Sequence, residues 1–379
     1  MSLDFASVLT KMVETRASDV HLTPGSPPAV RVRGRIVPMD DYPSLTPQET
    51  REIVYSILND SQRKKFENQL QLDLAYAIPG VARFRVNCFF QRGAVSAAFR
   101  HIPTEIQSLD SLGLPLVLEE FTRKPRGFVL ITGPTGSGKS TTLASMVDGI
   151  NSEREEHILT IEDPIEFLHH HKKCIVNQRE IGADAIDFGV ALKSALREDP
   201  DVILVGEMRD LETISTALTA AETGHLVFAT LHTQSTAQTV DRIIDVFPPY
   251  QQQQVRMQLS IALQGIVTQQ LLPTADGSAR IVACEVMVPT PAVRNLIREG
   301  KTHQIYSALQ TSGAVGMQTM DAHLAQLVRM GKITRTLAEQ RASVPEELKR
   351  LLMGAGPGLA SVPAPAPAPA PVIAEDGAR

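Results

Sequence analysis

An eight-residue loop at positions 133–140 constrains the fold of this chain more than any other feature. It reads Gly-Pro-Thr-Gly-Ser-Gly-Lys-Ser and fits the pattern G-x-x-x-x-G-K-[ST]. The apolar run 128–132 before it predicts a buried strand, and the apolar spacing of 141–150 after it predicts a helix. In such a strand–loop–helix unit, backbone N–H groups and a helix N-terminus point at bound phosphates. The chain is therefore expected to bind a nucleoside triphosphate.

Two residues of the loop have specific tasks in a site of this kind. Lys139 is expected to reach the β- and γ-phosphates, and the Ser140 hydroxyl to serve as a ligand of Mg²⁺. ATP and Mg²⁺ are thus the expected substrate and cofactor. The residues expected to contact the nucleotide are Gly133, Pro134, Thr135, Gly136, Ser137, Gly138, Lys139, Ser140 and Thr141.

Composition narrows the class of protein. The length of 379 residues suggests two domains at roughly 150 residues each, and the net charge of −5 gives no basic footprint, so no nucleic-acid partner is expected. The N-terminus lacks a signal-peptide pattern, and no apolar run approaches the roughly 18 residues of a membrane span. Cys88, Cys174 and Cys284 form no C-x-x-C pair and fit a reduced compartment. A cytosolic protein is expected.

The first hundred residues predict a small α+β domain. Apolar residues at helical spacing between Leu3 and Val13 predict an opening helix. Alternating apolar and arginine residues over 30–36 predict a half-buried strand with a bend or bulge at Gly34. Further strands are expected at 72–77, 81–87 and 95–100. The proline-containing stretch 101–115 is expected to link this domain, 1–100, to the next.

A different pattern spans residues 116–352. Apolar strand-like runs alternate with helical patterns, which predicts an α/β fold with an open, mainly parallel sheet and helices on both faces. These runs lie at 128–132, 157–161, 202–205 and 226–231. Helices are expected to continue from Thr236 to Leu352. The Gly-, Ala- and Pro-rich tail 353–379 has too little apolar bulk to offset its ordering entropy and is predicted to be disordered.

Carboxylates follow two of the expected strands. Glu162, Asp163 and Glu166 come at the end of one, and Glu207 follows another. Ligands of parallel sheets bind at the carboxyl ends of the strands, and phosphoryl transfer needs a carboxylate for the attacking water and an oxygen ligand for Mg²⁺. Glu166 is expected to activate water, and Glu207 to support Mg²⁺ together with Ser140; which glutamate is the dominant general base stays open. Arg209 is expected to pair with a carboxylate or a phosphate.

Two histidines flank the strand expected at 226–231. His225 and His232 lie 7 residues apart, about 23 Å in a strand, so they cannot share a metal ion. His232, at the carboxyl end, is expected to sense the γ-phosphate. His225 is expected to hold the strand entry or touch a neighbouring subunit; the alternative is that both are hydrogen-bonded without a ligand role. The histidine run 169–171 predicts a solvated loop, because adjacent residues cannot all face one ion.

Four blocks of the sequence resemble motifs of the secretion ATPase superfamily of type II secretion and type IV pili. They are a Walker A motif at 133–140, an Asp box at 160–166, a Walker B motif at 197–207 and a His box at 219–233. The stretches 16–22 and 83–87 are also similar, and the resemblance covers about 1–350. It implies a homohexamer in which a PAS-like domain precedes a RecA-like ATPase domain. It also implies that arginines of the first domain, matched here by Arg83, Arg85 and Arg100, close over the phosphates. The expected catalytic residues are then Lys139, Glu166, Glu207, His232, Arg85 and Arg100.

The segment 292–299 resembles the signature of the retraction ATPases within this superfamily, with Val293 where isoleucine is usual. The chain also lacks the four-cysteine zinc insert and longer N-terminal region typical of assembly and secretion ATPases. The resemblance implies a cytoplasmic motor for type IV pilus retraction (twitching motility), peripheral at the inner face of the membrane. It implies an inner-membrane platform protein as partner and allows for a second pilus ATPase; the segment 292–299 is expected to engage a neighbouring subunit or the pilus base. An assembly or secretion ATPase, an accessory nucleotide-binding subunit and, more remotely, a nucleic-acid translocase are the alternatives.

Overall fold

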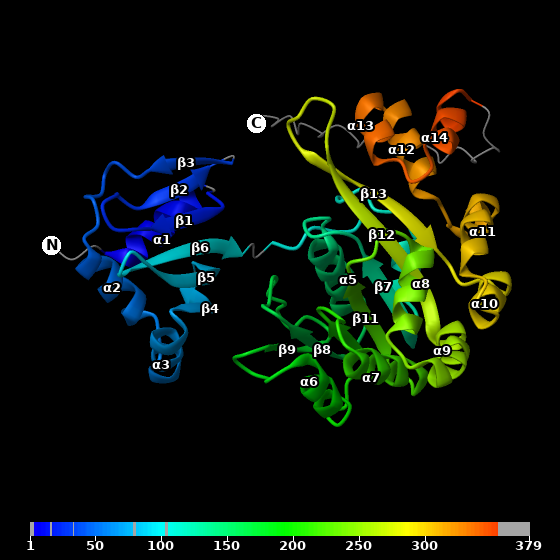
Figure 1. Cartoon of the computed structure of the whole chain (residues 1–379), viewed down its shortest axis with the longest axis horizontal. Helices are drawn as coiled ribbons and strands as arrows, with labels where there is room; N and C mark the ends of the chain where they lie inside the picture. Colours follow the sequence, from blue (N-terminus) through cyan, green and yellow to red (C-terminus); the bar gives the residue numbers. More distant parts are fainter. Residues whose placement is uncertain (1–3, 16, 33, 79–80, 103–104, 355–379) are drawn as a thin grey trace, which may run out of the picture.

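The computed structural model describes residues 4–15, 17–32, 34–78, 81–102 and 105–354, which build two units, each on its own sheet (Figure 1). From residue 355 onward the tail predicted to be disordered lies outside the described residues, as does Arg16 of the family-like stretch 16–22. Within the described ranges, no helix combines the length and the apolar character needed to cross a membrane.

The first unit is a six-stranded antiparallel sheet with helices packed on one face. Its strands lie in the order β3-β2-β1-β6-β5-β4. Val20, Phe84 and Phe99 point from the sheet into a core that they share with Val8 and Phe66 of the helices. Side chains alternate along a strand, so the residues between these face the opposite side. The elements are α1 (Phe5–Glu14), β1 (Asp19–Leu22), β2 (Ala29–Val32), β3 (Arg35–Pro38), α2 (Pro47–Ser56), α3 (Asp60–Gln69), β4 (Gln71–Ile78), β5 (Ala82–Gln91) and β6 (Ala94–Ile102).

The stretch 30–36 forms a hairpin, so the single bent strand expected there is wrong. Val32 at the end of β2 pairs directly with Arg35 at the start of β3. Gly34 has φ +83°, a left-handed conformation that glycine adopts without a steric penalty and that a tight hairpin turn needs. The opening helix and the three later strands are found as α1, β4, β5 and β6, and β6 continues to Ile102, beyond the expected domain end at residue 100.

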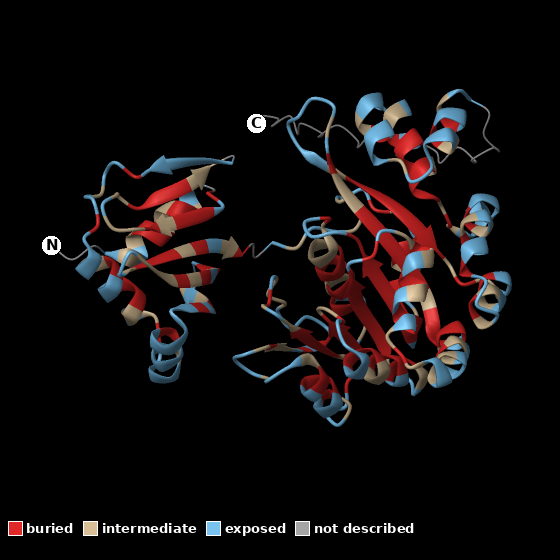
Figure 2. Ribbon diagram, in the orientation of Figure 1, coloured by how far each residue is buried: buried red, intermediate tan, exposed pale blue. Residues whose placement is uncertain are grey.

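The second unit is a seven-stranded sheet in the order β13-β12-β7-β11-β10-β8-β9, parallel except for β13. Helices α4 and α5 pack on one face, and α6 to α9 on the other, which gives the RecA-like α/β arrangement expected from the resemblance. Its central strands are buried along their whole length (Figure 2). The strands are β7 (Gly127–Thr132), β8 (His157–Glu162), β9 (Ile175–Glu180), β10 (Val202–Val205), β11 (Leu226–Leu231), β12 (Leu263–Pro273) and β13 (Arg280–Met287). The helices are α4 (Val117–Thr122), α5 (Lys139–Glu153), α6 (Phe188–Ala195), α7 (Leu211–Glu222), α8 (Thr236–Asp245) and α9 (Pro249–Ala262).

The expectation of helices throughout 236–352 is wrong for β12 and β13, which form a hairpin at the edge of the sheet. The apolar residues Leu263, Ile266, Val267 and Leu271 lie at positions i, i+3, i+4 and i+8, a spacing that also fits a helix. The β-branched pair at 266–267 and the Asp-Gly turn at 276–277 favour strands, and pairing of β12 with β7 completes the hydrogen bonding of the central sheet.

Five short α-helices follow the hairpin among the described residues. Those nearest to it extend the core around α8 and α9, and the last three pack against Leu272 and Ala283 of the hairpin. All three cysteines are free and buried, Cys88 in the first unit and Cys174 and Cys284 in the second. The helices are α10 (Pro291–Arg298), α11 (Ile305–Thr311), α12 (Met320–Arg329), α13 (Arg335–Arg341) and α14 (Pro345–Leu352).

Candidate active site

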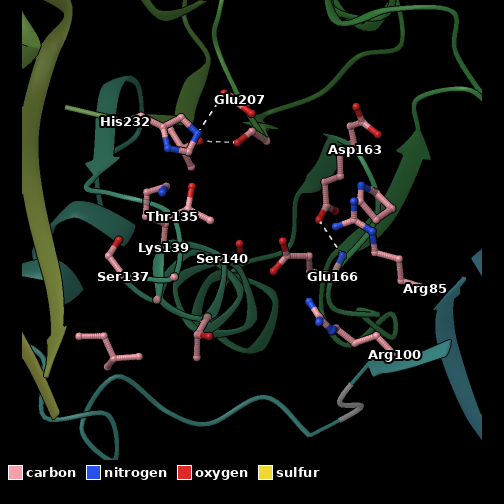
Figure 3. A pocket seen from close by; sticks show the side chains of 18 of the residues that line it. Arg85, Arg100, Thr135, Ser137, Lys139, Ser140, Asp163, Glu166, Glu207 and His232 are labelled. Atoms are coloured by element: carbon pink, nitrogen blue, oxygen red, sulfur yellow. Dashed lines mark hydrogen bonds and ion pairs between the residues drawn. The ribbon is translucent and has the colours of Figure 1, made fainter. Parts of the chain in front are cut away.

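Four loops meet at one edge of the second sheet. The strands β7, β11, β10 and β8 are parallel neighbours, so the loops at their carboxyl ends lie side by side. These loops and two arginines of the first unit line a cavity of about 460 Å³ (Figure 3). All six residues expected to be catalytic line this one cavity: Lys139, Glu166, Glu207, His232, Arg85 and Arg100.

The loop after β7 has the shape of a phosphate cradle. Gly133 has φ +138°, and a Cβ at this position would lie 2.4 Å from the Gln269 carbonyl oxygen, so only glycine fits. The loop ends at Gly138, directly before α5, whose N-terminus therefore faces the cavity. Residues 135–141 line the cavity; the Gly133 and Pro134 carbonyls instead accept hydrogen bonds from the Lys139 ammonium at 2.9 and 3.1 Å.

The charge of Lys139 is balanced by two carboxylates. Burial lowers the pKa of Lys139, and the negative charges of Glu207 and Glu166 oppose that shift. The ammonium therefore has acidic neighbours at both the Walker B strand and the Asp box. An anionic polyphosphate would bring further negative charge to the same position, which favours the cationic form of the lysine.

Glu207 is held from two sides. Arg209 donates from Nε to Oε1 at 2.6 Å and from an Nη to Oε2 at 2.7 Å, and His232 Nε2 lies 3.0 Å from Oε1. Burial works to raise the pKa of Glu207, but the hydrogen bonds and charge of Arg209, with His232, leave it below its ordinary value. Of the two partners considered for Arg209, the structure shows the carboxylate. Glu207 is thus an ionised, oriented carboxylate at the end of β10.

Glu162 turns inward, whereas Glu166 extends into the cavity. Glu162 Oε1 accepts hydrogen bonds from Thr160 Oγ1 at 2.7 Å and Gln178 Nε2 at 3.1 Å, and Oε2 faces the Glu166 N–H at 3.4 Å. Burial raises the pKa of Glu162. Glu162 therefore supports the loop, and Glu166 presents its carboxylate to the cavity beside Ser140 (Figure 3).

The two arginines come from adjacent strands of the first unit. Arg85 on β5 pairs with Arg100 on β6, and Arg100 pairs with Asp19 on β1, so the three side chains form one row across the sheet. Arg100 Nε donates to Asp19 Oδ1 at 2.9 Å, and Arg31 Nε lies 3.6 Å from Oδ2. Like charges directly opposite each other are unfavourable, so an anion beside the Arg85–Arg100 pair would be stabilising.

Arg83 and His225 lie away from the cavity. Arg83 Nη2 lies 2.6 Å from Glu180 Oε2, so this arginine binds a carboxylate of the second unit. His225 precedes β11, and its Nδ1 lies 3.0 Å from the Ala220 carbonyl oxygen, which fits the expected hold on the strand entry. The histidines therefore lie at opposite ends of β11, with His232 alone lining the cavity.

The histidine run 169–171 is only partly the solvated loop expected. His170 and His171 are exposed, but His169 is partly buried and lines a small cavity of about 40 Å³ behind Ser140. Burial lowers the pKa of His169 to about 4, because a charged ring would lose hydration there. Among the described residues there is no group of three His, Cys, Asp or Glu side chains that could hold a metal ion.

Sequence reasoning missed most of the residues that line a second cavity, of about 330 Å³, next to the phosphate loop. Leu271 and Arg280 line both cavities and come from the β12–β13 hairpin, which was expected to be helical. Gln107 and Leu112 come from the stretch expected to be a linker, and Gln269 reaches Thr142 Oγ1 at 2.9 Å. The Asp-Gly turn at 276–277 was the available signal for the hairpin.

The segment 292–299 lies mainly in α10. Val293 and Ile297 are buried against the core around α9, and Arg294 donates hydrogen bonds to the carbonyls of Ser260 and Ile261 at the end of α9. Arg294 therefore caps a neighbouring helix. The opposite side of α10, with Asn295, remains exposed.

Comparisons with known proteins agree with this geometry. The family model described as type II/IV secretion system protein matches residues 3–344. The chain is 52% identical to the type IV pilus retraction ATPase PilT of Pseudomonas aeruginosa, over 91% of this chain and 99% of the relative. It is 43% identical to the type IV pilus ATPase PilU of the same organism, over 92% and 91%. A crystal structure of the pilus retraction motor PilT with bound ADP is 51% identical and superimposes with a TM-score of 0.87, covering 92% and 99%.

Proposed function

This chain belongs to the type II/IV secretion system protein family, and we infer that it is an ATPase that drives type IV pilus retraction. The observation that carries the inference is one cavity that brings together the phosphate loop, the carboxylates of Glu166 and Glu207, and two arginines of the first domain. The retraction function comes from the similarity, over nearly the whole length of both chains, to a retraction ATPase and to a retraction motor that binds ADP.

Within the cavity, each side chain has a role in hydrolysis. Residues 133–141 bind the polyphosphate, with Lys139 at the β- and γ-phosphates. Glu166 orients or deprotonates the attacking water, because its carboxylate extends into the cavity while Glu207 is engaged by Arg209 and His232. His232, hydrogen-bonded to Glu207, reports the γ-phosphate to the Walker B strand.

Arg85 and Arg100 complete the site when the two domains approach each other. An arginine at the transferred phosphate is worth about 10³–10⁵ in rate, so withdrawing the first domain would nearly stop hydrolysis. Hydrolysis and domain movement are thereby coupled, as a motor requires.

The second cavity is the place for the nucleoside. It shares Ser137, Gly138 and Thr141 with the phosphate site, so a nucleotide whose phosphates lie on the loop can extend into it. Leu112 and Leu271 offer an apolar surface for a base, and Gln107 offers an amide.

Mg²⁺ fits the residues present. The Ser140 hydroxyl, one carboxylate and the phosphates are the few hard oxygen ligands that this ion prefers, since it keeps several of its waters. Both oxygens of Glu207 already accept hydrogen bonds from Arg209, which favours contact through a water molecule. When bound, the ion would neutralise charge that develops on the β- and γ-phosphate oxygens.

The assembly is a homohexamer at the inner face of the cytoplasmic membrane, acting on an inner-membrane platform protein. The exposed side of α10 is available to a neighbouring subunit or to the pilus base. A relative named type IV pilus ATPase PilU is 43% identical, so a second pilus ATPase of this kind is a further candidate partner. Light scattering of the full chain, with and without ATP, tests the oligomeric state.

The hydrolysis role is tested with Glu166→Gln. The variant should bind ATP as the unaltered protein does but lose at least about 100-fold in kcat, because general base catalysis contributes about 10²–10⁴. The control is Glu155→Gln, which changes an exposed glutamate of the same domain outside the cavity. Unchanged turnover in Glu166→Gln would transfer the role to Glu207.

The retraction function is tested in cells that lack their retraction ATPase. The intact chain should restore fibre shortening and twitching, and Lys139→Ala should not, because it removes the phosphate contact. Restored fibre growth in an assembly mutant would favour the assembly ATPase. If the chain promotes retraction only in the presence of a second ATPase, and purified rings hydrolyse ATP negligibly, the accessory subunit is favoured.

A further inference from the structure

One ion pair joins the two domains outside the cavity. Arg83 Nη2, on β5 of the first domain, lies 2.6 Å from Glu180 Oε2 at the end of β9. Both side chains are largely buried, with 19% and 8% of their surfaces exposed. An ion pair shielded from water is screened little by salt, and losing either partner leaves an uncompensated buried charge. The pair therefore defines where the first domain rests on the second.

The same carboxylate oxygen also holds the Asp-box loop. Glu180 Oε2 accepts a hydrogen bond from the Ile165 N–H at 3.2 Å, and Ile165 directly precedes Glu166. The position of Glu180 is fixed in turn, because its own N–H donates to Asp184 Oδ2 at 2.9 Å and β9 pairs with β8. A single oxygen atom thus contacts both the first domain and the backbone that carries the water-activating carboxylate.

Arg83 is also linked to the arginines of the cavity. Arg83 and Arg85 are two positions apart on β5 and therefore project from the same face of the sheet. Fixing Arg83 on Glu180 consequently fixes the strand that presents Arg85 to the phosphates. One ion pair therefore fixes the positions of both Arg85 and Glu166, on the two sides of the reacting centre.

We propose that Arg83 and Glu180 are positioning residues that place Glu166 and Arg85 in their hydrolytic arrangement only when the first domain is docked. The proposal rests on the ATPase function inferred above and assigns this ion pair to its regulation. Neither residue touches the nucleotide cavity, so the pair acts on the geometry of the transition state and not on the binding of ATP.

The test measures kcat and KM for ATP on assembled full-length protein carrying Arg83→Gln, Glu180→Gln, Glu180→Ala or both changes. Displacement of a catalytic group by about 1 Å can cost about 100-fold, so kcat should fall by about 10- to 100-fold with KM nearly unchanged. Glu180→Gln keeps an acceptor for Ile165 and should be less affected than Glu180→Ala. The double variant Arg83→Gln/Glu180→Gln should be no slower than the worse single variant, and Arg83→Lys should recover part of the rate.

The matched control is Arg154→Gln. Arg154 is as buried as Arg83, with 20% of its side chain exposed, and pairs with Glu156 at 2.5 Å, inside the second domain only and outside the cavity. Its turnover should stay close to that of the unaltered protein. The proposal is overturned if kcat is unchanged in Arg83→Gln and Glu180→Gln. It is also overturned if the losses in kcat are fully additive in the double variant, or if only KM changes. Absence of hydrolysis by the unaltered rings would instead refute the ATPase function itself. If Glu180→Ala fails to assemble, the kcat of Glu180→Gln decides whether Glu180 has the positioning role.

Discussion

Asp19 should control how fast this ATPase turns over, although it does not line the nucleotide cavity. Its carboxylate, with 10% of its surface exposed, accepts a hydrogen bond from Arg100 Nε at 2.9 Å, while 69% of the Arg100 side chain is exposed. The bond uses Nε and leaves the terminal nitrogens of Arg100 free to face the cavity. Asp19 therefore orients the arginine without competing with phosphate for it.

The magnitude follows from the freedom that Asp19 removes. A free arginine side chain carries about 2 kcal/mol of rotamer entropy, and a single contact at Nε fixes part of it, so losing the contact should cost about 1–2 kcal/mol in the transition state. At about 1.4 kcal/mol per tenfold change, Asp19→Ala should lower kcat by about 5- to 30-fold. Arg100→Ala, which removes the charge itself, should cost about 1,000-fold or more.

The assay is steady-state ATP hydrolysis by assembled rings, with KM and ADP affinity measured alongside kcat. Arg31→Gln is the control, because Arg31 pairs with the same carboxylate at 3.6 Å but does not line the cavity; it should change kcat less than twofold, as expected for a partly exposed ion pair. In an Arg100→Ala background, Asp19→Ala should have no further effect. The reasoning is refuted if Asp19→Ala slows that background as much as it slows the unaltered protein.

Two further predictions concern stability. A Cβ on Gly265 would lie 2.3 Å from the buried Phe121 ring, so Gly265→Ala should destabilise the second domain by about 1–3 kcal/mol in urea unfolding. Gly149 lies in α5, and its new Cβ would meet no neighbouring atom within 4 Å, so Gly149→Ala should stabilise the domain by about 0.5–1 kcal/mol. Equal urea unfolding midpoints for the two variants would contradict the prediction for Gly265. Burial lowers the pKa of His323 to about 4 from 6.5, so the unfolded chain takes up a proton before the folded chain does as the pH falls. The stabilisation from His323 should therefore be fully present above about pH 6.5, and the free energy of unfolding should fall by up to about 3 kcal/mol towards pH 4. His323→Gln should remove this part of the pH dependence. If the free energies of unfolding of the variant and the unaltered protein change with pH in parallel, His323 titrates normally.

The central site was predictable because its signals are local or follow from sheet geometry. The loop 133–140 carries its strand and helix with it, and the carboxylates and His232 each follow an apolar strand. Once those strands are parallel neighbours, their ends must converge. The sequence alone therefore predicts that these groups share one cavity.

Other parts of the site depend on contacts between distant residues. Arg83 and Arg85 share one face of β5, and alternation cannot tell which of them meets a carboxylate 97 residues further along the chain. In the same way, the spacing of Leu263, Ile266 and Val267 fits both a helix and a strand. Pairing of β12 with β7 decides between them, and that pairing brings Leu271 and Arg280 to the nucleotide cavity.

The burial of all three cysteines has a practical consequence for watching this motor move. Burial raises the pKa of Cys88 and Cys284 to about 12 and raises that of Cys174, so little thiolate, the reactive form, exists at neutral pH. A cysteine introduced on the exposed surface of α3, and another on α7, should consequently take up maleimide dyes well ahead of the native thiols. Fluorescence transfer between the two dyes could then follow domain closure during turnover in a protein that keeps its native cysteines.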